Sequence, residues 1–351
     1  MKVIRLFSVI LSLLTHLCSL GQNTELKATF DRAVEEFDAY EKAHGGFVQT
    51  DNVNMHYMEW GKPTAPTLIW VHGSFTNAFE MKPFASQLVA KGYRVIAIDY
   101  YGHGQTPIPE HEVSLYHVAD DIHQLMETKN IDKAIVGGWS RGGYIATAFY
   151  DAYPGKVLGL ILEDGGSVAT NTYYHKMTKE ALNERMDEIF TDRFDPGRYP
   201  TRQEAYQALY NPEQGGIQFE LLAWLRQNKA GQWTMGPGTE ALFHMDNKTH
   251  FLQTILRPTK ATLFGESMAL IEPKIIYRKL SVPMLIMDPV SENDLFPFEA
   301  ENKTLQQSHP DKITLNVYED TGHNIHYEKP EQFVKDVVAF LEKVQAYWQN
   351  R

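Results

Sequence analysis

The sequence has very little cysteine, because Cys18 is the single one among 351 residues. It lies in the N-terminal segment MKVIRLFSVILSLLTHLCSLGQN, where Lys2 and Arg5 precede a short apolar run and small residues near Gly21. That order predicts a secretory signal peptide at residues 1–21, with an uncleaved membrane anchor as the alternative. Cleavage would leave a secreted or periplasmic chain without cysteine, which excludes disulfides and thiol chemistry.

Positive charge is also scarce. The chain has 33 Lys and Arg against 44 Asp and Glu, a formal net charge of −11 at pH 7, and signal cleavage would remove two further cations. This acidity makes nucleic acid and anionic membrane surfaces poor partners. We therefore expect a small-molecule substrate and no stable membrane association after signal cleavage.

What the sequence does contain is a regular alternation of strands and helices. An amphipathic helix is predicted at 25–43, and within 22–166 short, continuously apolar strands such as PTLIWVHG then alternate with helices. The alternation stops over 167–280, where helical segments are separated by proline and glycine, and it resumes over 281–351. This pattern predicts an α/β fold with a mostly parallel central sheet flanked by helices, interrupted by a helical insertion.

The segment AIVGGWSRGGYIA at 134–146 carries the strongest chemical signal. Gly138-Trp139-Ser140-Arg141-Gly142 fits G-x-S-x-G and lies between a predicted strand and a predicted helix. In that context the glycines make room for a sharp turn that exposes the serine as a nucleophile. The alternative is a tight turn with a bystander serine.

A serine nucleophile needs a base within hydrogen-bond reach. Thr321-Gly322-His323 follows the last predicted strand, where a loop at the carboxyl end of a parallel sheet can reach the crevice beside Ser140. His326 is a competing candidate, but His323 directly follows the glycine that lets the loop turn. No H-E-x-x-H spacing or cysteine site occurs, so we expect no catalytic metal and no organic cofactor.

The acid that orients the histidine has several candidates. Three carboxylates follow the penultimate strand in MDPVSENDLFPF, and Asp294 is favoured among them. Asp288 follows that strand so closely that it is expected to be held within it, and Glu292 is expected to be solvated. Asp164, which ends the strand in LEDGG, is a further candidate whose alternative role is to stabilise a loop.

Acyl transfer also requires donors aimed at the developing oxyanion. His72-Gly73-Ser74-Phe75 follows the first buried strand, and the backbone amide of Ser74 or Phe75 is predicted to be one donor. The amide of Arg141 is predicted to be the other, while His72 is expected to brace the loop. Two aromatic residues beside these motifs, Trp139 and Tyr101, are the candidate substrate-binding residues.

Together the motifs HGS, DYYGHGQT, GWSRGG and DTGHNIHYEKPEQF resemble the α/β-hydrolase superfamily over 46–166 and 281–345. The resemblance implies a capped serine hydrolase in which Ser140, Asp294 and His323 are the nucleophile, acid and base, and in which the insertion is a cap. The sequence departs from the common pattern in Trp139, which replaces a frequent histidine, in the bulky Arg141, and in the spacing around the acid.

The function predicted from these residues is hydrolysis of a carboxylic ester of a small, apolar or aromatic substrate through an acyl-enzyme. The same framework supports amide or peptide cleavage as in aminopeptidase-like members, lactone opening and carbon–carbon bond hydrolysis. A non-catalytic ligand-binding protein is a further alternative, which the intact serine and histidine disfavour. Epoxide hydrolysis and dehalogenation are disfavoured because similar proteins with those activities usually place aspartate where Ser140 stands.

Overall fold

The computed structural model describes residues 26–191, 197–235, 242–244, 247–256, 258–292 and 296–351. The predicted signal peptide and the favoured acid Asp294 lie outside the described residues. The chain divides into two compact units, one of Met1–Ala43 with Pro196–Met235 and one of His44–Asp195 with Gly236–Arg351. All candidate site residues with described positions belong to the second, larger unit.

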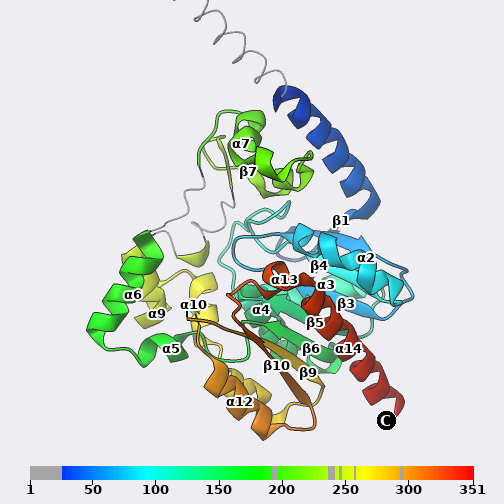
Figure 1. Cartoon of the computed structure of the whole chain (residues 1–351), viewed down its shortest axis with the longest axis vertical. Helices are drawn as coiled ribbons and strands as arrows, with labels where there is room; N and C mark the ends of the chain where they lie inside the picture. Colours follow the sequence, from blue (N-terminus) through cyan, green and yellow to red (C-terminus); the bar gives the residue numbers. More distant parts are fainter. Residues whose placement is uncertain (1–25, 192–196, 236–241, 245–246, 257, 293–295) are drawn as a thin grey trace, which may run out of the picture. The chain divides into compact units, whose positions relative to one another are not determined.

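Within the described residues, an eight-stranded sheet forms the centre of the larger unit (Figure 1). Counted across the sheet, the first strand pairs antiparallel with the second, and the second pairs antiparallel with the third. Every further pair of neighbouring strands is parallel. This confirms the predicted mostly parallel α/β sheet. In sheet order the strands are β1 (Gly45–Gln49), β2 (Asn54–Trp60), β4 (Arg94–Ile98), β3 (Thr67–Val71), β5 (Ala134–Trp139), β6 (Val157–Glu163), β9 (Met284–Val290) and β10 (Ile313–Glu319).

Helices cover both faces of this sheet, which explains why its central strands are apolar throughout. Trp70 of β3 packs edge-on against Phe333, with ring centroids 5.8 Å apart, and Phe333 also contacts Phe84. Ile69 and Val71, which point to the opposite face, belong to the main apolar core. The flanking helices are α2 (Lys82–Ala90) beside α14 (Pro330–Gln349), and α3 (Leu115–Thr128) beside α4 (Arg141–Ala152).

Local sequence signals set where these helices begin. α3 starts at a capping box in which the Ser114 side chain accepts from the His117 N–H and the His117 ring accepts from the Ser114 N–H. α14 starts with Pro330. Proline lacks a backbone N–H, and this costs nothing here because the N–H groups of a helix's first turn have no acceptor within the helix. α12 (Glu299–Ser308) connects β9 to β10.

The segment predicted as one helical insertion is divided between the two units. The larger unit contains α5 (Asn171–His175), α6 (Lys179–Thr191), α9 (Lys248–Leu256), α10 (Leu263–Leu270) and α11 (Pro273–Ile276). The smaller unit contains α7 (Arg202–Leu209) and also a hairpin of β7 (Leu225–Gln227) and β8 (Trp233–Met235), so the insertion is not all helical. Gly231, with a φ of +77°, supplies the backbone conformation that the tight connection of the hairpin requires.

The N-terminal helix packs within the smaller unit. Phe30 contacts Tyr206 with ring centroids 5.6 Å apart, and Tyr40 contacts Phe219 at 5.5 Å. The Arg202 guanidinium lies over the ring of Phe37, 5.4 Å from its centroid. The apolar side chains of this helix therefore have a packing role.

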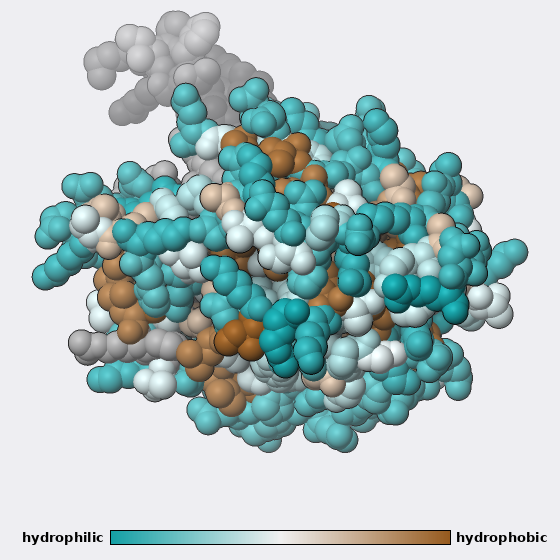
Figure 2. Space-filling view, turned by 90° about the horizontal axis from the view of Figure 1, so that it is seen from below, coloured by the Kyte–Doolittle hydropathy of each residue, from teal (hydrophilic) through white to brown (hydrophobic). Residues whose placement is uncertain are grey.

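Hydrophilic side chains predominate on the face of the molecule drawn in Figure 2, and apolar ones appear there in separate groups. Among the described helices, none is both long and apolar enough to span a bilayer. Two of the exposed large apolar side chains, Phe75 at 47% and Tyr327 at 48%, lie within four residues of the predicted oxyanion and histidine motifs. They mark the side of the sheet where the candidate site lies.

Candidate active site

Ser140 occupies the turn between β5 and α4. Its φ of 53° and ψ of −121° lie in a region that residues with a side chain rarely adopt, and α4 begins at the next residue. Such strain persists only where the surrounding structure enforces it, and it is common at functional sites. The strand, sharp turn and helix that the G-x-S-x-G pattern predicts are therefore present.

The glycines around this serine are required by close backbone approaches. A Cβ on Gly142 would lie 1.9 Å from the carbonyl oxygen of Val71, and one on Gly165 would lie 2.1 Å from that of Ser140. The turn thus packs directly on the end of β3 and on the loop after β6. On the other side of the serine, a Cβ on Gly138 would lie 2.4 Å from the carbonyl carbon of Gly142, so both flanking positions require glycine.

His323 and Asp164 form a direct pair beside the turn. Nδ1 of His323 lies 2.5 Å from Oδ2 of Asp164, whose side chain is 1% exposed while that of the histidine is 16% exposed. Asp164 directly follows β6 with a φ of 41°. Burial raises the pKa of the Asp164 carboxyl, and the charge and hydrogen bond of His323 oppose that shift.

The structure pairs His323 with Asp164, the further candidate from the sequence, while the favoured Asp294 stays an untested prediction. Nδ1 carries a single proton, and Asp164 accepts it, whereas Asp294 lies outside the described residues. Asp288 is held within β9 at 1% exposure, as expected, and Glu292 is exposed. The physical reason is the sheet order, because β6 lies beside β5 and its carboxyl end opens next to Ser140.

The competing histidine, His326, is buried in a second pair. It lies in the short helix α13 (Ile325–Glu328), 1% exposed, with Nδ1 2.8 Å from Oε1 of Glu163. The same carboxylate oxygen accepts the backbone N–H of His326 at 2.9 Å. His326 therefore has no open path to a substrate. Glu163 was not predicted from the sequence, because nothing in the pattern distinguishes it from the end of any other buried strand.

The predicted oxyanion motif, residues 72–75, follows β3 and approaches Arg141; the loop that contains it, here called the oxyanion loop, continues to Thr76. The Nε of Arg141 donates to Oγ of Ser74 at 3.0 Å, and its guanidinium lies 3.8 Å above the ring centroid of Phe243. His72 stacks on Tyr100 at 4.2 Å, which confirms its bracing role. Burial, with a smaller contribution from the charge of His103, lowers the pKa of His72 to about 3, so this ring is neutral at physiological pH.

The two candidate substrate-binding residues have other contacts. Trp139 is 7% exposed, its Nε1 donates to the carbonyl oxygen of His323 at 2.7 Å, and its ring lies against Gly73. Tyr101 is completely buried and donates its hydroxyl to Asp121 at 2.6 Å. The substrate-binding prediction for Tyr101 is therefore wrong, because its polar atom is already bonded away from the site.

The charged groups near the turn are two carboxylate–histidine pairs and one arginine. Burial lowers the pKa of Arg141 to about 10, which leaves the guanidinium charged at neutral pH. In the part of the chain that the structure describes, no group of three or more His, Cys, Asp or Glu could hold a metal ion. The arrangement supplies an oriented imidazole and a buried cation beside a strained serine.

Comparisons with known proteins agree with this architecture. The family model of the alpha/beta hydrolase fold matches residues 66–219. The structure of a membrane phospholipase A aligns with a TM-score of 0.61 and 19% identity, covering 95% of this chain and 97% of that one. The chain therefore has the α/β-hydrolase fold. It also aligns with a putative lipase from Acinetobacter baumannii AYE, at a TM-score of 0.60, 18% identity, and 90% and 97% coverage.

Curated proteins with similar sequences include an esterase/perhydrolase and an epoxide hydrolase. A bifunctional esterase/perhydrolase from Acinetobacter calcoaceticus is 23% identical over 301 residues, which are 84% of this chain and 99% of that protein. Epoxide hydrolase 1 of Caenorhabditis elegans is 31% identical over 121 residues, which are 33% of this chain and 29% of that protein. The full-length match to an esterase supports hydrolase activity.

Proposed function

We propose that the protein is a secreted serine hydrolase that cleaves a carboxylic ester of a small apolar or aromatic molecule. Ser140 is the nucleophile, His323 the general base and Asp164 the acid that orients it. The observation that carries the proposal is the 2.5 Å contact between Asp164 and His323 beside the strained serine turn. Secretion rests on the basic and apolar order of the first 21 residues.

The proposed reaction follows from these groups. Nε2 of His323 takes the hydroxyl proton of Ser140 as Oγ bonds to the ester carbonyl carbon, and the amides of Ser74 and Arg141 stabilise the oxyanion. The tetrahedral intermediate then expels the alkoxide, which receives the proton from His323, and leaves an acyl-enzyme. Water repeats the cycle with the same base and releases the carboxylic acid.

The surroundings of His323 favour an apolar substrate. The ring of Phe296 meets that of His323 edge-on with centroids 5.4 Å apart, and Phe75 is half exposed on the oxyanion loop. Ester hydrolysis is preferred over the amide, lactone and carbon–carbon alternatives because a relative matched over nearly its full length is described as an esterase. Epoxide hydrolysis is disfavoured because a serine stands at the position where we expect aspartate in such enzymes.

Hydrolysis of p-nitrophenyl esters of increasing acyl length by the mature protein tests the proposal. We expect turnover of wild type and a loss on the order of 10⁴-fold or more in kcat for Ser140→Ala and for His323→Ala, with melting curves unchanged. Retained turnover in folded Ser140→Ala would refute the nucleophile. Well-folded wild type that hydrolyses no ester would refute the substrate class.

A further inference from the structure

The backbone of the oxyanion loop is held from one side through a carbonyl group. In a trans peptide the C=O and the following N–H point in opposite directions, so the carbonyl of Gly73 sets the direction of the Ser74 N–H. No peptide bond in the described chain is cis. The Gly73 oxygen accepts from the Tyr100 hydroxyl at 3.0 Å and from Nδ1 of His72 at 2.7 Å. The Ser74 N–H is therefore directed away from both rings.

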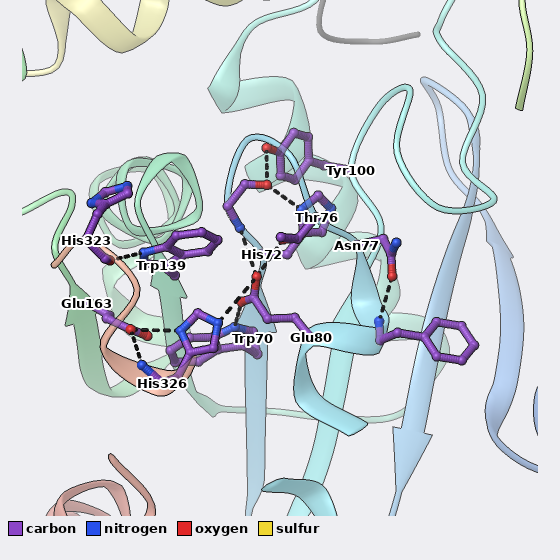
Figure 3. A network of polar contacts seen from close by, with 12 residues as sticks. Trp70, His72, Thr76, Asn77, Glu80, Tyr100, Trp139, Glu163, His323 and His326 are labelled. Carbon is purple, nitrogen blue, oxygen red and sulfur yellow. Dashed lines mark hydrogen bonds and ion pairs between the residues drawn. The ribbon is translucent and has the colours of Figure 1, made fainter. Parts of the chain in front are cut away.

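Glu80 holds the same loop from the other side (Figure 3). Its Oε2 accepts from the Gly73 N–H at 3.4 Å and from the Thr76 hydroxyl at 2.5 Å. Its Oε1 accepts from the indole N–H of Trp70 at 2.7 Å. Glu80 lies in a short 3₁₀ turn at 4% exposure, so its carboxylate is a fixed and water-shielded anchor.

A buried carboxylate is costly without a compensating charge. Nε2 of His326 lies 4.0 Å from Oε2 of Glu80, and Nδ1 of the same ring contacts Glu163 (Figure 3). Burial raises the pKa of Glu80, and the charge of His326 opposes that shift. The second carboxylate–histidine pair thus supports Glu80 as an anchor.

The contacts of the other polar groups of Ser74 indicate which of its atoms is available to a ligand. Its carbonyl oxygen lies 2.8 Å from Nε2 of His103, and its hydroxyl accepts from Arg141. Among the hydrogen bonds of the described residues, none uses the Ser74 N–H as donor. The backbone N–H of Ser74, whose direction the peptide group between Gly73 and Ser74 sets, is therefore left for a ligand.

We propose that Tyr100 and Glu80 are positioning residues that aim the Ser74 N–H at the oxyanion of the tetrahedral intermediate. Neither side chain touches a reacting atom. Tyr100 fixes the carbonyl of the peptide group between Gly73 and Ser74. Glu80 fixes the Gly73 N–H, which belongs to the peptide group before it, and the Thr76 hydroxyl that follows. The inference rests on the proposed acyl transfer.

The first test compares two neighbouring tyrosines. Tyr100→Phe keeps the ring stacked on His72 but removes the donor to Gly73, whereas Tyr101→Phe removes a hydroxyl that donates to Asp121 and not to the oxyanion loop. We expect Tyr100→Phe to lower kcat roughly tenfold, less than the ~10²–10³-fold loss when an oxyanion donor is removed, with KM within about twofold. Tyr101→Phe should retain wild-type kcat.

The second test uses a pair of glutamates. Glu80→Gln leaves a single acceptor oxygen on the side chain, which can accept from Trp70 or from the loop but not from both. We therefore expect kcat to fall roughly 10- to 100-fold. Glu59→Gln is the matched control, since Glu59 pairs with Arg94 and Lys129 and has no contact with the oxyanion loop. Affinity for an aryl trifluoromethyl ketone, whose hemiketal oxygen mimics the oxyanion, should fall by the same factor as kcat/KM.

The outcomes separate this inference from the function on which it rests. Turnover that survives Ser140→Ala refutes the proposed function. If Ser140→Ala is inactive but Tyr100→Phe and Glu80→Gln lose no more than their controls, or lose only through KM, the positioning role is overturned. If Tyr100→Phe fails to fold, Glu80→Gln and Thr76→Val decide, because each removes one tie to the loop and leaves the tyrosine in place.

Discussion

Two carboxylate–histidine pairs lie side by side in this protein, and only one of them is suited to catalysis. Asp164 pairs with His323 and Glu163 with His326, each through Nδ1, at 2.5 Å and 2.8 Å. The carboxylates are consecutive in sequence and the histidines three residues apart. Exposure separates them, because the side chain of His323 is 16% exposed and that of His326 only 1%.

The local geometry explains how adjacent residues reach such different surroundings. Successive side chains of a strand point to opposite faces, and Glu163 is the last residue of β6. Its partner His326 contacts Phe333, 5.8 Å away, on the face of the sheet that α14 covers. Asp164 follows with a positive φ, which turns the chain toward the serine turn. The same pairing therefore anchors a loop on one face, and on the other it holds His323, the base of the proposed reaction.

The largest expected effect comes from breaking the catalytic pair. Asp164→Asn removes the charge that holds the imidazole tautomer and stabilises the imidazolium, and we expect kcat for a p-nitrophenyl ester to fall on the order of 10³- to 10⁴-fold. Steady-state kinetics of the folded variant measure it.

Asp294→Asn is the control for that loss. We expect it to stay within about threefold of wild type, because Nδ1 already donates to Asp164. If Asp294→Asn lost the larger factor, the assignment of the acid would be wrong. A raised pKa for Asp164 further predicts that wild-type activity is lost, as pH falls, at higher pH than for an exposed aspartate.

The next effect concerns stability and the other pair. Burial alone would lower the pKa of His326, but Glu163 and Glu80 outweigh burial and raise it. The stabilisation by protonated His326 is fully present below the unfolded pKa of about 6.5 and is lost as pH rises through the raised folded pKa. The pKa of Glu80 is also raised, so its contribution to stability is likewise lost as pH rises. We expect the free energy of unfolding, from urea melts at pH 6 to 9, to fall with rising pH.

His326→Gln should flatten that pH dependence and lower the free energy of unfolding at pH 6 by about 3–5 kcal/mol, since it leaves two buried carboxylates uncompensated. His323→Gln should abolish turnover and cost less stability than His326→Gln, because it leaves one buried carboxylate uncompensated and not two. Equal destabilisation by the two variants would contradict the division of roles between the pairs.

The sequence predicted the elements that depend on local pattern, including the parallel sheet, the serine turn and the histidine loop. It did not reveal that Asp164 pairs with His323, because the order of strands in the sheet is a long-range property that no local pattern reveals. Glu80 escaped notice for a similar reason, since its partners Trp70 and His326 lie 10 and 246 residues away in sequence. The hairpin of β7 and β8 was missed because two three-residue strands carry too little periodicity to register.

Trp139 lies between the two pairs and provides the finest test of their separation. Its Nε1 donates to the backbone oxygen of His323, and its ring meets that of His326 edge-on at 5.0 Å. Trp139→Phe removes one hydrogen bond worth about 1 kcal/mol, so we expect kcat to fall roughly fivefold as the His323 loop loosens. Trp348→Phe is the matched control, because its indole donates to the backbone oxygen of Leu158 at 2.9 Å. It should lose comparable stability and no activity, and an equal loss of kcat in both variants would mean that Trp139 acts through packing alone.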